Sequence, residues 1–127
     1  MNKMPPMKEH QLMPLLKNYL QAKGWWVMRI NSGAIRATNK YGNQHMIRLA
    51  EVGMPDLMAF RSADRGIKDY FELTQLLFIE VKTPQNPKPT FAQKQKMIEL
   101  EEHGARCLVI HSLEELEEEV RKERTVV

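Results

Sequence analysis

Two short stretches carry side chains whose types and spacing could do chemistry. Residues 53–56 (GMPD) place Asp56 at the head of an apolar run, and residues 78–83 (FIEVKT) place Glu80 two positions before Lys82. In a strand, residues i and i+2 project from the same face, about 7 Å apart, so Glu80 and Lys82 point together. If the strand that follows Asp56 pairs beside theirs, two carboxylates and an ammonium meet on one small surface.

Such a group of side chains suits a divalent metal and a water nucleophile. Carboxylate, carbonyl and water oxygens are the preferred ligands of hard cations such as Mg²⁺ or Mn²⁺, and the sequence has no Cys/His cluster for zinc. A metal held in this way can lower the pKa of a bound water and hold phosphate oxygens. Lys82 could orient the attacking water or neutralise charge that develops on phosphorus. Chemistry of this type cleaves phosphodiesters.

Length and composition predict one globular domain over residues 1–127, with 28% charged and 43% hydrophobic residues. No apolar run approaches the ~20 residues that cross a bilayer, and the N-terminus lacks the apolar core of a signal peptide. The single cysteine, Cys107, cannot form an internal disulfide, and its apolar neighbours indicate a small buried residue rather than a nucleophile. We therefore expect an intracellular, cytoplasmic protein with no membrane partner.

The net charge of +3 is distributed unevenly along the chain. Residues 1–98 contain 15 Lys/Arg against 7 Asp/Glu, whereas residues 99–127 contain 4 against 9. The basic part includes the candidate site, as expected if the partner is a polyanion. Charge alone leaves open a solvated surface on which the two signs segregate without function.

The apolar pattern predicts a first helix over residues 9–23, because apolar side chains recur at i, i+3, i+4, i+7 and i+8 from Leu12. Pro14 fits only within the first turn, where its missing N–H is not needed, so the helix is expected to begin near residues 10–13. Glu9 then lies at or just before the start of the helix. Beyond Gly24, strands are expected at residues 25–30, 34–38, 44–50, 54–60, 75–82 and 105–110, and helices at 90–103 and from 112.

The order of these elements indicates the fold class. Short turns join the first three strands, which favours an antiparallel meander. Strand, helix and strand over residues 76–110 form a βαβ unit, hence two parallel strands with a right-handed crossover. The helix of this unit is expected to turn Met97, Ile98 and Leu100 inward. The result is an α/β fold with a mixed sheet flanked by helices, in the order αβββ(β)βαβα.

The residues of the candidate site resemble a known nuclease motif. Pro55-Asp56 followed by Glu80-Val81-Lys82 is similar to the motif of the PD-(D/E)XK nuclease superfamily, which has the restriction-endonuclease-like fold. The wider pattern resembles the virus-type replication-repair nuclease (VRR-NUC) family over about residues 9–111. That pattern comprises GMPDL at 53–57, FIEVKT at 78–83, TFAQ at 90–93, Gly104, RINSG at 29–33 and the upstream Glu9.

The resemblance implies roles for particular residues. The implied metal ligands are Glu9, Asp56, Glu80 and the carbonyl of Val81. The implied catalytic residues are Asp56, Glu80, Lys82 and Gln93. Compact members of the family act as homodimers on branched DNA, so the resemblance implies a Mg²⁺- or Mn²⁺-dependent, structure-specific DNA endonuclease, prokaryotic or phage-encoded, that resolves Holliday junctions. Candidate phosphate contacts are Arg29, Arg36, Lys40, Arg65, Lys88, Lys94 and Lys96.

Other readings of the same residues stay open. Glu80 and Lys82 could form an edge-strand ion pair worth ~0–1 kcal/mol, and Asp56 could simply form a turn. Thr90-x-x-Gln93 is itself a capping box, which would explain Gln93 without catalysis.

Alternatives also remain for Glu9 and for the two tryptophans. Glu9 could serve only the helix dipole, and one of Trp25 and Trp26 is expected in the core, although either could stack on bases.

Two other functions for the whole protein compete with the junction-resolving enzyme. They are a nicking or restriction-type nuclease and a non-catalytic nucleic-acid-binding module.

Overall fold

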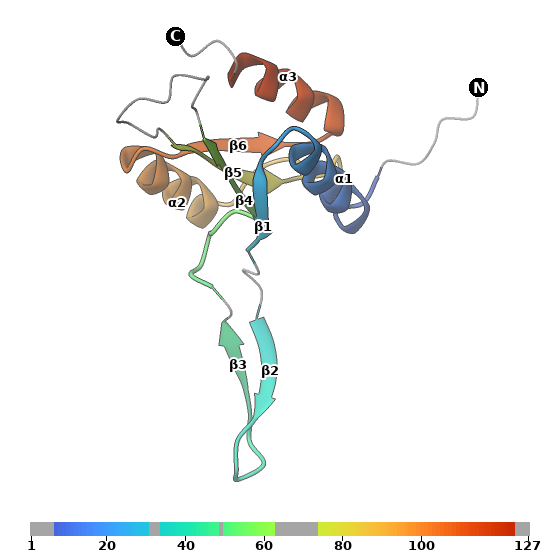
Figure 1. Ribbon diagram of the computed structural model, residues 1–127. Helices are drawn as coiled ribbons and strands as arrows, with labels where there is room; N and C mark the ends of the chain where they lie inside the picture. Colours follow the sequence, from blue (N-terminus) through green and yellow to red (C-terminus); the bar gives the residue numbers. More distant parts are fainter. Residues whose placement is uncertain (1–6, 31–33, 49, 63–73, 124–127) are drawn as a thin grey trace, which may run out of the picture.

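The computed structural model describes residues 7–30, 34–48, 50–62 and 74–123 of the chain. Helices and strands in these ranges lie within a few residues of their expected positions (Figure 1). Asp56 comes just before its strand rather than inside it, and Arg65 lies outside the described residues. The elements are α1 (Glu9–Ala22), β1 (Trp26–Arg29), β2 (Ala34–Thr38), β3 (Gln44–Arg48), β4 (Leu57–Ser62), β5 (Thr74–Val81), α2 (Phe91–Glu102), β6 (Arg106–Ile110) and α3 (Leu113–Glu123).

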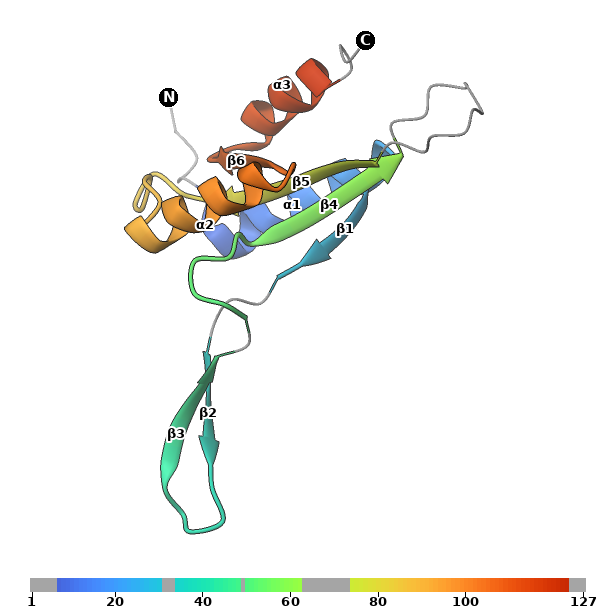
Figure 2. The ribbon, with the colours of Figure 1, turned by 90° about the vertical axis from the view of Figure 1, so that its left-hand side faces the viewer.

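The main sheet is mixed and has the strand order β1-β4-β5-β6. β4 is antiparallel to both β1 and β5, and β5 is parallel to β6, which confirms the α/β class and the βαβ unit. The predicted antiparallel meander is confirmed for β2 and β3 and wrong for β1. β1 pairs with β4, whereas β2 and β3, among the strands described, pair with each other and extend away from the main sheet as a hairpin (Figures 1 and 2).

The physical reason for this pairing is burial of one face of β1. Val27 is 7% exposed and lies opposite the fully buried Ala59 of β4, so the long-range pair buries apolar surface that a local β1–β2 pair would leave in water. The sequence pattern of β1 cannot distinguish the two partners, because both pairings satisfy the same alternation.

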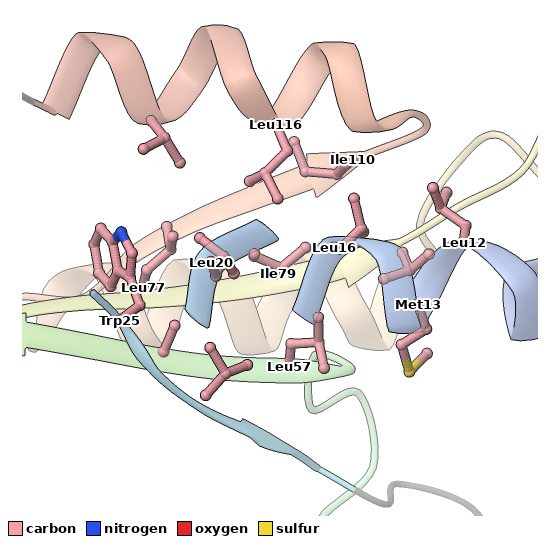
Figure 3. Packing of buried hydrophobic residues seen from close by; sticks show 14 residues of the cluster. Leu12, Met13, Leu16, Leu20, Trp25, Leu57, Leu77, Ile79, Ile110 and Leu116 are labelled. Carbon is pink, nitrogen blue, oxygen red and sulfur yellow. The ribbon is translucent and has the colours of Figure 1, made fainter. Parts of the chain in front are cut away.

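Helices cover both faces of the sheet. α1 and α3 lie on the face that carries Leu57, Ile79 and Ile110, and together with the sheet they enclose the main apolar core (Figure 3). α2 lies on the opposite face, where the Cys107 thiol approaches the Met97 carbonyl at 3.7 Å. Of the residues expected inward on α2, Met97 and Leu100 are half-buried, but Ile98 is 52% exposed and that prediction is wrong.

On the face of the sheet that α2 covers, the half formed by β1 and β4 stays partly exposed to solvent. Trp26 is 51% exposed there and stacks on Phe60 with ring centroids 4.9 Å apart, whereas Trp25 is buried in the core. The expectation that one tryptophan packs inside is therefore confirmed. Within the described residues, no helix combines the length and the apolar character that would let it cross a membrane.

Pro14 occupies an unfavourable position in α1. The helix begins at Glu9, with Lys8 as the N-cap and its N–H donating to Gln11 Oε1 at 2.9 Å, so Pro14 falls in the second turn and not in the first as expected. Proline there removes the hydrogen bond to the His10 carbonyl and crowds the preceding turn. Burial of the Leu12, Met13, Leu16 and Leu20 side chains offsets this cost.

Replacing this proline should therefore stabilise the protein. We expect Pro14→Ala to raise the free energy of unfolding by about 1–3 kcal/mol, measured by urea denaturation. Asn18→Ala, one turn further along an exposed part of α1, is the control and should change it by no more than about 0.7 kcal/mol. Equal effects of the two substitutions would show that α1 accommodates the proline without strain.

Candidate active site

The pairing of β4 with β5 brings Asp56 to the end of β5. Leu57 lies opposite Ile79, so Asp56 comes next to Glu80 in the same register. The Asp56 carboxylate oxygen Oδ2 accepts a hydrogen bond from the Val81 N–H at 2.7 Å, and its main-chain carbonyl accepts one from the Ile30 N–H at 2.7 Å. Asp56 is thus held from both neighbouring segments.

Glu80 and Lys82 project together, as the strand spacing predicts. Their side chains are 3% and 6% exposed, and Lys82 Nζ lies 3.6 Å from Glu80 Oε1. β5 is an interior strand of the sheet, so an exposed ion pair on an edge strand does not describe them. Taking two charges out of water is costly and is more often explained by a site than by stability.

One oxygen of Glu80 accepts no hydrogen bond from the residues that the structure describes. Oε1 accepts one from Gln93 Nε2 at 2.8 Å, whereas Oε2 is buried and has no donor among these residues. Burial first, and then the neighbouring Asp56 carboxylate, raise the pKa of Glu80 to about 8. Burial also raises the pKa of Asp56, against the hydrogen bond from Val81. The buried Glu80 carboxylate and the half-buried Asp56 carboxylate beside it therefore require either a proton or a cation between them.

The carboxylate oxygens of Asp56 and Glu80 are suitable ligands for a hard divalent cation. Mg²⁺ in proteins is commonly held by one or two carboxylates, with waters and substrate phosphate completing its shell. Asp56 and Glu80 would supply the two carboxylates, and Glu80 Oε2 is the oxygen left free to bind. In the described part of the chain, no group of three His, Cys, Asp or Glu side chains forms a complete cage, so protein side chains alone do not saturate such an ion.

The raised pKa of Glu80 predicts how stability depends on pH. Between the ordinary pKa of 4.5 and about 8, the folded protein keeps a proton that the unfolded chain releases, so stability falls as pH rises through this range. In EDTA, we expect a loss of up to about 1.4 kcal/mol per pH unit, measured by urea denaturation. Glu80→Gln should flatten the profile, and Mg²⁺ should stabilise the wild type more at pH 8 than at pH 6. A flat profile in the wild type would contradict the proton assignment.

Gln93 combines both roles considered for it. Its Oε1 accepts a hydrogen bond from the Thr90 N–H at 2.8 Å and completes the capping box of α2, while its Nε2 donates to Glu80 Oε1. The orientation of the amide follows from the chemistry, because a main-chain N–H must face the amide oxygen. The cap positions the amide, so a single residue both starts the helix and orients Glu80.

A matched pair of substitutions separates these roles. Thr90→Ala and Gln93→Ala should each destabilise α2 by about 1 kcal/mol, because each removes one half of the capping box. Only Gln93→Ala also frees Glu80, and we expect it to lower cleavage of a DNA substrate in Mg²⁺ about tenfold further than Thr90→Ala. If the Thr90→Ala and Gln93→Ala variants had equal stability and cleaved DNA equally well, Gln93 would act only as a helix cap.

Glu9 and Arg29 lie beside the carboxylates without joining them. Burial raises the pKa of Glu9, the Asp56 carboxylate raises it further, and the charges of Lys82 and Arg29 lower it. Arg29 also lowers the pKa of Asp56. Glu9 lies exposed in the first turn of α1, and its role as a metal ligand and that of the Val81 carbonyl stay predictions.

The remaining candidate phosphate contacts are dispersed. Lys96 is ion-paired with Glu51 at 2.6 Å and with Glu99 at 3.2 Å. Lys88 and Lys94 are exposed near α2, and Lys40 lies in the hairpin turn with its Nζ 5.1 Å from the Tyr41 ring centroid. Arg65 and the side chain of Arg36 lie outside what the structure describes. Of the described side chains in this group, neither Lys40 and Lys88 nor Lys94 and Lys96 form an ion pair with Asp56 or Glu80.

The structure also reveals a groove that sequence reasoning missed. A cavity of about 700 Å³ opens beside Glu9 and Arg29 and continues along α1 past Lys17, Asn18 and Gln21. These three residues belong to α1 and lie outside the apolar stripe that begins at Leu12. Their shared helical face was visible in the sequence, but the opposite wall, which includes Leu57 of β4, was not.

No protein-family model matches the chain, and neither a curated protein nor a solved structure matches it significantly. The assignment of a function therefore depends on the geometry of the site and on the motif it contains.

Proposed function

We propose that the protein is a metal-dependent, structure-specific DNA endonuclease of the VRR-NUC type. The observation that carries the proposal is the buried Glu80 carboxylate, which lies beside Asp56 and Lys82 and has one oxygen without a donor. An acid kept in this state costs stability unless it binds something, and a divalent cation is the partner that its chemistry favours.

Each side chain has a part in phosphodiester hydrolysis under this proposal. Asp56 and Glu80 hold Mg²⁺ or Mn²⁺, which supplies Lewis-acid activation of a phosphate oxygen and of a water when bound. Lys82 stabilises the negative charge that develops on the phosphate, and Gln93 keeps Glu80 oriented. Glu9 adds a further acidic side chain at the edge of the site.

The fold and the partner form part of the same proposal. The mixed sheet, with α1 on one face and α2 on the other, is assigned to the restriction-endonuclease-like fold. The substrate is branched DNA inside the cell, with a four-way junction as the preferred form. The active species is a homodimer, since two equivalent sites related by a twofold axis suit paired cuts on a twofold-symmetric junction.

The test is cleavage of end-labelled DNA in Mg²⁺, with a four-way junction, a flap and a linear duplex of the same sequence compared side by side. We expect junction cleavage that EDTA stops and that Asp56→Asn and Lys82→Ala each abolish. Light scattering on the same sample measures the oligomeric state, and a monomer would contradict paired cutting. Cleavage of the linear duplex at an equal rate would instead favour a nicking or restriction-type nuclease.

One observation favours a second function, a binding module without cleavage. The described residues contain no complete metal cage, so the fold could hold DNA while the carboxylates share a proton. Tight junction binding with no cut in either Mg²⁺ or Mn²⁺ would support that function and refute the enzyme.

A further inference from the structure

The β2–β3 hairpin stands apart from the rest of the fold. Its strands pair with each other from Ala34↔Arg48 to Thr38↔Gln44, and neither strand belongs to the main sheet. Both views show the hairpin extending away from the sheet and its helices (Figures 1 and 2). A two-stranded hairpin without further packing is only marginally stable in water. A projecting arm of this kind is therefore suited to contact a partner molecule.

The hairpin carries positive charge and no acid. Residues 34–48 contain Arg36, Lys40 and Arg48 and neither Asp nor Glu, and the same absence of acids extends over residues 10–50. Lys40 is exposed and forms no ion pair with a carboxylate in the ranges that the structure describes. A projecting element with one sign of charge is complementary to a polyanion.

The tip of the hairpin is a preformed turn. Asn39 Oδ1 accepts hydrogen bonds from the N–H groups of Tyr41 and Asn43, at 2.9 and 3.0 Å. The Asn39 N–H donates to the Asn43 carbonyl at 2.9 Å, and the Asn39 carbonyl accepts from the Gly42 N–H at 3.0 Å. Lys40 Nζ lies 5.1 Å from the centroid of the Tyr41 ring, and Tyr41 is 77% exposed. The turn thus presents a cation and an aromatic ring in a fixed arrangement, which lowers the entropy that binding costs.

Both ends of the hairpin are fixed beside the candidate active site. At the end of β1, which precedes the hairpin, the Ile30 N–H donates a hydrogen bond to the Asp56 carbonyl at 2.7 Å. Residues 50–56 lead from the other end of the hairpin to Asp56, and within them Glu51 is ion-paired with Lys96 of α2 at 2.6 Å. A substrate with a phosphate at the carboxylates therefore has its adjoining segment within reach of the hairpin.

The dimensions of the hairpin match a groove of duplex DNA. Its strands have five residues each and rise about 17 Å, at ~3.4 Å per residue, whereas the major groove is about 12 Å wide and about 8.5 Å deep. That groove admits a two-stranded ribbon, and known DNA-binding proteins place one there. An unpaired strand offers no such groove. The shape of the hairpin therefore favours a duplex as the partner.

Charge argues against a second copy of the chain as the partner. Two hairpins brought together would place cation against cation. The acids of the chain are concentrated in α3, and three glutamates of this helix already have basic partners within their own chain. These are Glu115 with His111, Glu118 with Arg121, and Glu119 with Arg106 and Lys122. A duplex instead presents one negative charge per ~1.7 Å of its axis.

We infer that the β2–β3 hairpin is a DNA-binding arm that lies in the major groove of the duplex next to the scissile phosphate. The inference rests on the proposed nuclease function and specifies how that site holds its substrate. Arg36, Lys40 and Arg48 neutralise phosphates that border the groove, while Asp56 and Glu80 face the phosphate at the foot of the arm.

The salt dependence of DNA binding tests the arm. Fluorescence anisotropy with a labelled four-way junction in Ca²⁺ gives the binding constant at several salt concentrations. Each phosphate contact contributes about 0.9 to the slope of its logarithm against the logarithm of the salt concentration. Arg36→Ala/Lys40→Ala/Arg48→Ala should lower this slope by about 2–3 and weaken binding at least about tenfold. Arg36→Lys/Lys40→Arg/Arg48→Lys keeps the three charges and should bind like the wild type.

A matched control removes three cations elsewhere on the protein. Lys23→Ala/Arg121→Ala/Lys122→Ala makes the same change of net charge at the ends of α1 and α3, and should change the slope by less than about 1. An equal fall of the slope in the hairpin variant and in this control would show a general attraction of charge, and would overturn the arm.

The outcomes separate the arm from the enzyme. If the hairpin variant keeps the wild-type slope while the wild type cuts junctions in Mg²⁺, the arm is refuted and the nuclease stands. If the hairpin variant loses the slope but the wild type cuts no DNA in Mg²⁺ or Mn²⁺, the arm stands and the enzyme is refuted. If the wild type neither binds nor cuts DNA, both fail.

Photocrosslinking locates the arm on the DNA. In 5-iododeoxyuridine, iodine replaces the thymine methyl group, which lies in the major groove. Placed along a duplex arm of the junction, this base should crosslink to a peptide that includes the exposed Tyr41 or Met46, mapped by mass spectrometry. Crosslinks to α1 or α2 alone would place the duplex elsewhere and overturn the inference. Protein–protein crosslinks that join Lys40 of one copy to α3 of another would show that a second chain occupies the hairpin, and would also overturn it.

Discussion

The Glu80→Gln variant is expected to lose cleavage of a four-way junction by at least about 10³-fold in Mg²⁺, with junction affinity unchanged. Glutamine has the shape of glutamate and still accepts the hydrogen bond from Gln93 Nε2, so the local packing stays intact. It lacks the anionic oxygen that lies buried without a donor beside Asp56. The loss therefore measures the charge on Glu80 and not its volume.

Two comparisons make this result interpretable. Glu114→Gln, at an exposed position of α3, is the matched control and should cut like the wild type. Metal-free Glu80→Gln should also be more stable than the wild type near pH 8, because it no longer pays for burying a carboxylate. Undiminished cleavage by Glu80→Gln would refute the site, even if the protein proved to be a nuclease.

The Gly53→Ala variant is expected to lose both stability and activity. Gly53 has φ +85°, and a Cβ there would lie 2.7 Å from the Ala92 carbonyl carbon and 3.1 Å from the Gln93 nitrogen, with the Ala92 oxygen closer still. These are main-chain atoms in the first turn of α2, so no side chain can rotate away. We expect a loss of about 2–5 kcal/mol, which combines left-handed strain with forced displacement of the helix.

Activity should fall with stability for a specific reason. Moving the start of α2 away from Gly53 also moves Gln93 away from Glu80. Gly104→Ala is the control at the other end of the same helix. It has φ +97° but an open space around its Cβ, so it should cost only about 1–2 kcal/mol and leave cleavage intact. Equal losses in urea denaturation for the two variants would show that close approach to α2 is unimportant.

Local patterns predicted much of this fold and failed at definable points. Periodicity located α1 over nearly its full length, whereas the argument from Pro14 placed its start too late, because burial of the leucines outweighs the cost of the proline. The apolar residues of α2 suggested that Ile98 faces inward, yet the low amphipathicity of that helix left its orientation to the contact with Cys107 and Glu80. β1 was expected to pair with β2, its neighbour in sequence, but it pairs with β4, which lets one of its faces be buried.

The sequence by itself determined which reactive side chains the candidate site contains. It places Asp56 directly after Gly53-Met54-Pro55, and it places Glu80 and Lys82 at a spacing that puts them on one face of a strand. These are properties of residue type and of the two-residue period, which need no distant partner. Only the tertiary structure decided what surrounds them. Pairing between β4 and β5 placed Asp56 against the Val81 N–H, and packing of α2 left Glu80 Oε2 buried and without a donor. Burial and long-range strand pairing join segments far apart in the chain, so no local pattern contains them.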